Sequence, residues 1–131
     1  MRKNKTFNPN GCPVTHVHNL IGGKWKPVIL HLIRKGGNRF SILQRGIPEI
    51  SKQMLVNQLR ELEEDRLLRR EVFAEVPPRV EYALTELGFS IVPVIEAMEE
   101  WGIWHMNQIR EAGAEHVAQG VPANQNGKTH C

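Results

Sequence analysis

One segment of the chain carries polar side chains that can each form two hydrogen bonds at once. The amides of Gln53 and Asn57 donate and accept together, as the edge of an adenine does, and the guanidinium of Arg60 matches guanine or a phosphate. At about 100° of rotation per residue, these side chains share one face of a helix. That face comprises Ser51, Lys52, Gln53, Val56, Asn57 and Arg60, and the opposite face carries Leu55, Leu59 and Leu62. The pattern favours contact with nucleic-acid bases, and its alternative is an ordinary solvated helix face.

Further cations flank this segment. Arg79 follows Pro77 and Pro78, which restrict the backbone, so its side chain is placed to enter a minor groove or to contact phosphate. For each cation the alternative is a solvated surface charge. The other candidate phosphate contacts are Lys24, Lys26, Arg39 and Arg45.

A second chemistry is carried by Cys12, which precedes Pro13 at the expected start of a helix. Unpaired N–H groups and the positive end of the helix dipole stabilise a thiolate there, so Cys12 is a redox-sensing candidate. The alternative is a small buried apolar residue. Cys131 is the only other cysteine and could serve as a resolving partner. Cys12, His16 and His18 do not converge as metal ligands, and we expect no metal or cofactor.

Four helices are expected in the N-terminal half. The first spans 12–21, with Cys12 as its cap, and the second runs from about Lys24 to Gly36-Gly37, with Trp25 on its apolar stripe and in the core. Ser41 is expected to cap a short helix, and Ser51 a longer one. A short helix, a turn and a longer helix with a polar outer face predict a helix-turn-helix.

The periodicity changes after this motif. Residues 67–74 and 80–84 alternate as strands around the sequence Val76-Pro77-Pro78-Arg79, which predicts a hairpin. Thr85 is expected to cap one final helix over 86–110, kinked at Pro93. Its apolar stripe is longer than one small core requires.

These elements predict an α+β, mostly helical fold: a winged helix-turn-helix DNA-binding domain with terminal dimerisation helices. We expect a mobile N-terminal tail at 1–11 and the folded domain at 12–112. The dimerisation helices are 12–21 and 86–110, and a second mobile tail covers 113–131.

Composition and charge narrow the function. Residues 1–60 hold eleven Lys and Arg against one acid, Glu49, whereas residues 61–131 hold six against thirteen. A basic half that carries the polar helix face favours double-stranded DNA as the partner. No apolar run approaches the roughly 18 residues of a membrane span and no secretory signal is present, so we expect a cytoplasmic protein without a membrane partner or a structural disulfide. The chain contains neither a P-loop nor the common hydrolase motifs, so we expect no enzyme.

Several segments together resemble the HxlR-type winged helix-turn-helix transcriptional regulators, which are MarR-like. The resemblance covers about residues 12–105 in unbroken order. Its segments are Cys12-Pro13, IGGKWKPVIL (21–30), RFSIL (39–43), ISKQMLVNQLRELEED (50–65) and VPPRVEYALTELG (76–88). It implies a homodimeric bacterial regulator that binds a pseudo-palindromic operator, with terminal helices at the dimer interface.

The resemblance sharpens two residues. Some family members sense oxidants or electrophiles through a cysteine at the position that matches Cys12. Arg66 stands where the family usually has glycine, so the turn after the recognition helix either differs here or is strained. A ligand-responsive regulator with a structural Cys12, and a nonspecific DNA-binding protein, remain the alternatives. The inducing signal, small molecule or oxidant, is not encoded in these motifs.

Overall fold

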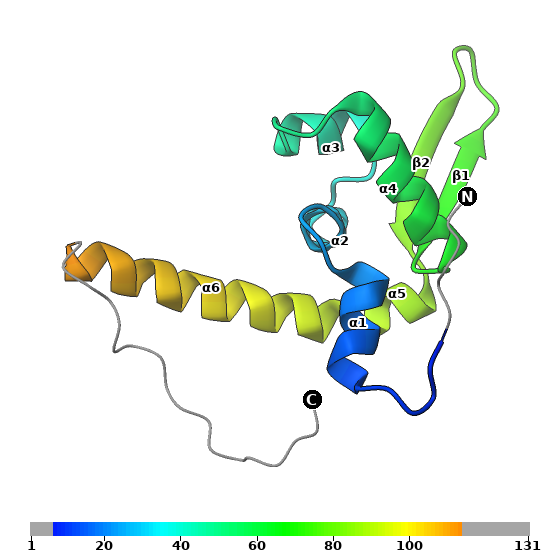
Figure 1. Cartoon of the computed structure of the whole chain (residues 1–131). Coiled ribbons are helices and arrows are strands. Elements are labelled where there is room, and N and C mark those ends of the chain that lie inside the picture. Colours follow the sequence, from blue (N-terminus) through cyan, green and yellow to red (C-terminus); the bar gives the residue numbers. More distant parts are fainter. Residues whose placement is uncertain (1–6, 114–131) are drawn as a thin grey trace.

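The computed structural model describes residues 7–113. Three helices form the centre of the molecule, namely α2 (Lys26–Arg34), α3 (Phe40–Gly46) and α4 (Lys52–Glu64). A hairpin of β1 (Leu68–Phe73) and β2 (Arg79–Leu84) rises beside α4. The remaining helices are α1 (Pro13–Ile21), α5 (Glu86–Ser90) and α6 (Val92–Ala112), and α6 extends away from the centre as a long arm (Figure 1). The arrangement is a mostly helical winged helix-turn-helix fold.

The core lies among these elements and is almost entirely aliphatic. Leu55, Leu59 and Leu62 seat α4, while Leu68 and Leu84 close the base of the hairpin as a cross-strand pair. The other buried apolar residues are Ile21, Ile29, Leu30, Ile33, Leu43, Ile47, Ile50, Leu67, Ile91 and Ile95. The leucine stripe predicted for α4 therefore faces the core as expected, and Trp25 packs against it.

The antiparallel hairpin runs in register from Leu68 opposite Leu84 to Phe73 opposite Arg79. β2 is fixed to the centre because the Tyr82 backbone N–H donates to the Asn38 carbonyl at 2.9 Å. Arg79 is thus the first residue of β2, one position inside the strand, and the connecting turn is 74–78.

Helix ends confirm some predicted caps and correct others. Cys12 and Pro13 start α1, Ser51 caps α4 by accepting from the Met54 N–H at 3.0 Å, and Thr85 caps α5. The cap predicted at Ser41 is wrong, because the extended residue is Arg39 (φ −130°, ψ 152°) and α3 begins at Phe40. Phe40 packs against the core, which starts the helix one residue earlier.

The expectation of one kinked final helix is also wrong. The chain turns at Ile91, so α5 and α6 are separate helices, and Pro93 lies in the first turn of α6. A proline costs no backbone hydrogen bond there, since the first N–H groups of a helix have no partner within it. Similarly, the second helix begins at Lys26, with Trp25 as its cap, two residues later than predicted.

The tails predicted at 1–11 and 113–131 lie mostly outside the described residues. Among the helices of the described part, none is long and apolar enough to cross a membrane.

Candidate nucleic-acid interface

The exposed face of α4 brings the predicted base-reading residues together. Ser51, Lys52, Gln53 and Arg60 are exposed, and Val56 and Asn57 are half-buried along the same face. The Gln53 amide donates to the Asn57 carbonyl oxygen at 3.1 Å, so the two amides already lie within one hydrogen bond of each other. The helix thus presents adjacent donors and acceptors on the side that faces away from the core.

An ion pair from below fixes the position of α4. Lys26 Nζ lies 2.7 Å from Glu61 Oε1, and the Lys26 side chain is only 8% exposed. The expectation that Lys26 contacts phosphate is therefore wrong, because its charge is buried and paired between α2 and α4. A buried pair of this kind orients one helix on the other.

The remaining predicted cations surround α4 at the surface. Lys24 is exposed with its ammonium 4.8 Å from the centre of the Trp25 ring. Arg39 is exposed and lines, with Phe40, Ser41 and the hairpin turn, a hollow of about 480 Å³. Arg45 is exposed at the end of α3.

Arg79 is not a free charge at the hairpin. Its Nη1 lies 2.7 Å from Glu75 Oε2 and its Nε lies 3.1 Å from Glu81 Oε2. The guanidinium also sits over the Phe73 ring, 4.1 Å from its centre. These contacts hold a positive group on the hairpin, but any nucleic acid must compete with two carboxylates for it.

Residues that the sequence reasoning missed lie between α4 and the hairpin. Arg70 and Tyr82 are cross-strand neighbours, and with Val56, Arg60 and Glu63 they line a hollow of about 360 Å³. The signal was available: Arg70 shares its side of the strand with buried Leu68 by period-two alternation, so it faces the helix.

Cys12 lies away from the α4 face, half-buried at the start of α1. It is disulfide-bonded in the structure, so the expectation that no structural bridge forms is wrong. Cys131 lies outside the described residues. Within residues 7–113 no group of three His, Cys, Asp or Glu side chains converges as a metal site.

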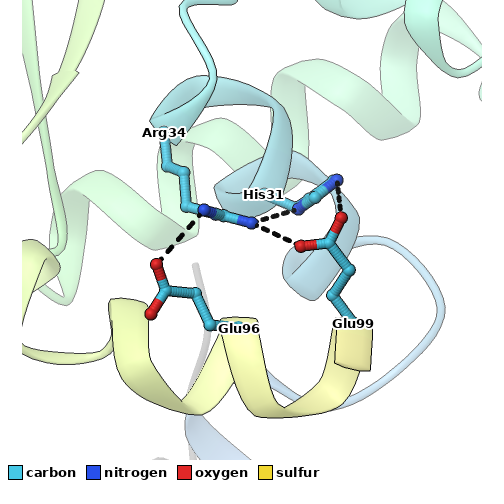
Figure 2. A network of polar contacts seen from close by, with 4 residues as sticks. All are labelled: His31, Arg34, Glu96 and Glu99. Atoms are coloured by element: carbon cyan, nitrogen blue, oxygen red, sulfur yellow. Dashed lines mark hydrogen bonds and ion pairs between the residues drawn. The ribbon is translucent and has the colours of Figure 1, made fainter. Parts of the chain in front are cut away.

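A polar network joins the long helix α6 to the centre (Figure 2). Arg34 of α2 donates to Glu99 at 2.8 Å and to Glu96 at 3.4 Å, and its Nη2 lies 3.3 Å from His31 Nδ1. The network ties the direction of α6 to the helix on which α4 is seated.

Apolar side chains along α1 and α6 are left exposed. A hollow of about 420 Å³ lies between α1, α2 and α6, with Val14, Val94 and Met98 in its lining. Further along α6, the half-exposed Trp101 ring stacks on His105 with centres 4.8 Å apart and planes 12° apart. A soluble protein seldom leaves an apolar strip of this length uncovered.

Comparison with known proteins agrees with this geometry. The model of the HxlR-like helix-turn-helix family matches residues 20–110. A helix-turn-helix-type transcriptional regulator of Methanothermobacter thermautotrophicus is 52% identical over 91 residues, which is 70% of each chain. The redox regulator HypR is similar in two solved forms. The oxidised form is 46% identical, with a TM-score of 0.67 over 70% of this chain and 94% of its own. The reduced form is 41% identical, with a TM-score of 0.71 over 76% and 98%.

Proposed function

The chain belongs to the HxlR-like helix-turn-helix family, and from this premise we propose that it is a transcriptional regulator that binds a pseudo-palindromic DNA operator as a homodimer. The observation that carries the proposal is the polar outer face of α4, which stands clear of the core beside a β-hairpin. An α-helix with such a face fits the major groove of B-DNA.

Base contacts are assigned to the N-terminal half of α4. Gln53 and Asn57 carry amides suited to adenine, and Arg60 carries a guanidinium suited to guanine or phosphate; each good base contact contributes about 1–3 kcal/mol of discrimination. Ser51 and Lys52 lie at the helix start, where backbone phosphates approach, and Val56 offers an apolar contact to a thymine methyl group. Acidic residues at the far end of α4, such as Glu63 and Glu64, would repel phosphate.

Flanking contacts go to the DNA backbone. Lys24 and Arg39 are exposed cations on either side of the α4 seat, which supports phosphate contacts from both. Arg79 would reach the minor groove or a phosphate only after leaving Glu75 and Glu81. Because those carboxylates must be released, wing contact costs free energy that a well-matched site is better able to offset.

The dimer is assigned to the two terminal elements, residues 12–21 and 86–110. The apolar hollow between α1 and α6 and the exposed Trp101 support this, since a second copy would cover both. Two recognition helices in successive major grooves would then stand about 34 Å apart. The folded domain would thus span about 12–112 and act in the cytoplasm.

Selection of bound duplexes from a random pool by the full chain tests this proposal. We expect enrichment of an inverted repeat whose half-site centres are about 10 base pairs apart. Enrichment of single half-sites would contradict the dimeric mode. A pool that binds without enrichment would support the alternative, a nonspecific DNA-binding protein.

We further propose that the regulator responds to oxidants through Cys12. HypR is a redox regulator of similar sequence and fold, and Cys12 stands at the N-cap of α1, where the helix dipole stabilises a thiolate. Two thiols that form a disulfide give up two electrons and two protons, which an oxidant such as diamide accepts. A disulfide at α1 would change how the dimer helices set the two copies of α4.

The test compares DNA binding before and after diamide. The unmodified chain is expected to change its affinity, Cys12→Ser is expected not to respond, and Cys131→Ser shows whether the second cysteine resolves the intermediate. An unchanged response in Cys12→Ser would leave a structural Cys12 and a ligand-responsive regulator as the favoured alternative.

A further inference from the structure

The hollow between α4 and the hairpin, lined by Val56, Arg60, Glu63, Arg70 and Tyr82, is here called the α4–hairpin hollow. Its polar wall comes from two different elements. Arg60 belongs to the recognition helix, while Arg70 and Tyr82 face each other across the two strands. A group seated in the hollow would contact the helix and the hairpin at once.

Strand geometry determines which hairpin side chains reach this hollow. Side chains alternate between the faces of a strand, so Arg70 lies on the same face as buried Leu68 and turns toward the helices. Arg69 lies on the opposite face, where its Nε is 3.2 Å from Glu71 Oε2. The two neighbouring arginines are thus in different environments.

The charges in the hollow are not compensated. Arg34, Arg69 and Arg79 each pair with glutamate. Within residues 7–113, neither Arg60 nor Arg70 forms an ion pair, and Glu63 pairs with neither of them. Two guanidinium groups and a phenol hydroxyl therefore converge with unused hydrogen-bond donors, and the matching ligand is a tetrahedral oxyanion such as phosphate.

The position of the hollow identifies the source of that phosphate. Val56 and Arg60 belong both to the hollow and to the face of α4 assigned to the major groove. A duplex read by α4 has its sugar-phosphate backbone at the groove edge, beside the helix and toward the wing. We propose that the α4–hairpin hollow is a binding site for a DNA backbone phosphate, held by Arg60, Arg70 and the Tyr82 hydroxyl. The inference rests on the proposed function and assigns Arg70 and Tyr82 a role in it.

Salt-dependent DNA binding by matched variants of the full chain tests the proposal. Arg70→Ala is expected to weaken binding to cognate and scrambled duplexes alike, by about tenfold. The slope of log affinity against log salt is expected to become shallower by about 0.9, the value for one lost phosphate contact. Arg69→Ala removes the same charge from the next position and is expected to leave both quantities nearly unchanged.

Two further variants probe the charge and the donors of the hollow. Arg70→Lys is expected to retain the salt slope with part of the affinity, because it keeps the charge without the paired donors. Glu63→Gln removes a carboxylate from the rim and is expected to raise affinity about two- to threefold. Unfolding curves of each variant control for loss of structure.

Equal effects of Arg70→Ala and Arg69→Ala would overturn the phosphate site, as would an unchanged salt slope in a folded Arg70→Ala variant. Displacement of DNA by millimolar inorganic phosphate in the unmodified chain but not in Arg70→Ala would show that a free phosphate is the ligand and would overturn the backbone assignment. If the unmodified chain binds no duplex, the proposed function fails, and that result is separate from these outcomes.

Discussion

At the scale of single residues, Arg66 shows how the fold tolerates a departure from the family pattern. It has a left-handed backbone (φ 61°) directly after α4. Its carbonyl accepts a hydrogen bond from the Thr85 hydroxyl at 2.6 Å, and that hydroxyl also accepts from the Gly88 N–H at 2.9 Å. The turn predicted from the family pattern therefore forms, with a strained non-glycine residue in it.

Arg66→Gly is expected to stabilise the chain. Relief of the left-handed strain is worth about 1–2 kcal/mol, and glycine returns about 0.5–1 kcal/mol as unfolded-state entropy. We therefore expect the free energy of unfolding in urea to rise by about 0.5–1 kcal/mol.

Glu64→Gly, two residues earlier inside α4, is the matched control and is expected to lower the same free energy by about 1 kcal/mol. A less stable Arg66→Gly variant would mean that the Arg66 side chain contributes more than its backbone costs.

At the scale of elements, periodicity and caps were sufficient for α1, α4 and the hairpin. The leucine stripe of α4 and the Ser51 cap are local signals, and both are found in the structure. The breaks at Phe40 and Ile91 depend on which neighbour packs against the core, and no local rule supplies that information.

The candidate site divides in the same way. The outer face of α4 follows from helical geometry, so its members could be predicted from the sequence. The pairing of Lys26 with Glu61 and the capture of Arg79 by two glutamates depend on distances between elements, which no single segment contains. Arg70 was missed although alternation with Leu68 indicated its direction.

Arg34→Met is expected to weaken the junction between α2 and α6. Arg34 is 16% exposed and contacts Glu96 and Glu99, and a hydrogen bond to a charged group is worth about 1.5–3 kcal/mol. Both carboxylates are partly solvated, and the methionine keeps the packing of the stem. We therefore expect the unfolding free energy to fall by about 1–2 kcal/mol at fixed protein concentration.

Arg110→Met is the control, because Arg110 lies at the exposed end of α6 and donates only to Asn107 among the described residues. It is expected to change the free energy by no more than about 0.5 kcal/mol. Equal losses in the two variants would show that the network of Figure 2 does not hold α6.

At the scale of the whole molecule, the uncovered strip on α1 and α6 predicts self-association. Met98 is 49% exposed and contributes to hollows on both sides of α6. Met98→Glu places a charge where the second copy is expected, so sedimentation should show a dimer dissociation constant raised about tenfold or more.

Val72→Glu introduces the same charge at an exposed hairpin position (57%) and is expected to leave the dimer intact. A dimer that is equally stable in both variants would exclude α6 as the interface.

The division of charge along the sequence is also resolved at this scale. The basic segments 24–60 contain the helix-turn-helix and its flanking cations, and the acidic remainder includes α6, which is expected to face the partner copy rather than DNA. The molecule therefore presents one positive side to a duplex.

The central claim is that α4 reads DNA sequence, and the most direct measurement is fluorescence anisotropy of the full chain on the duplex upstream of its own gene and on a scrambled duplex, near 150 mM salt. We predict binding to the upstream duplex at least about 10³-fold tighter than to the scrambled one, the lower end for specific regulators. Equal affinity for the two duplexes would contradict the claim.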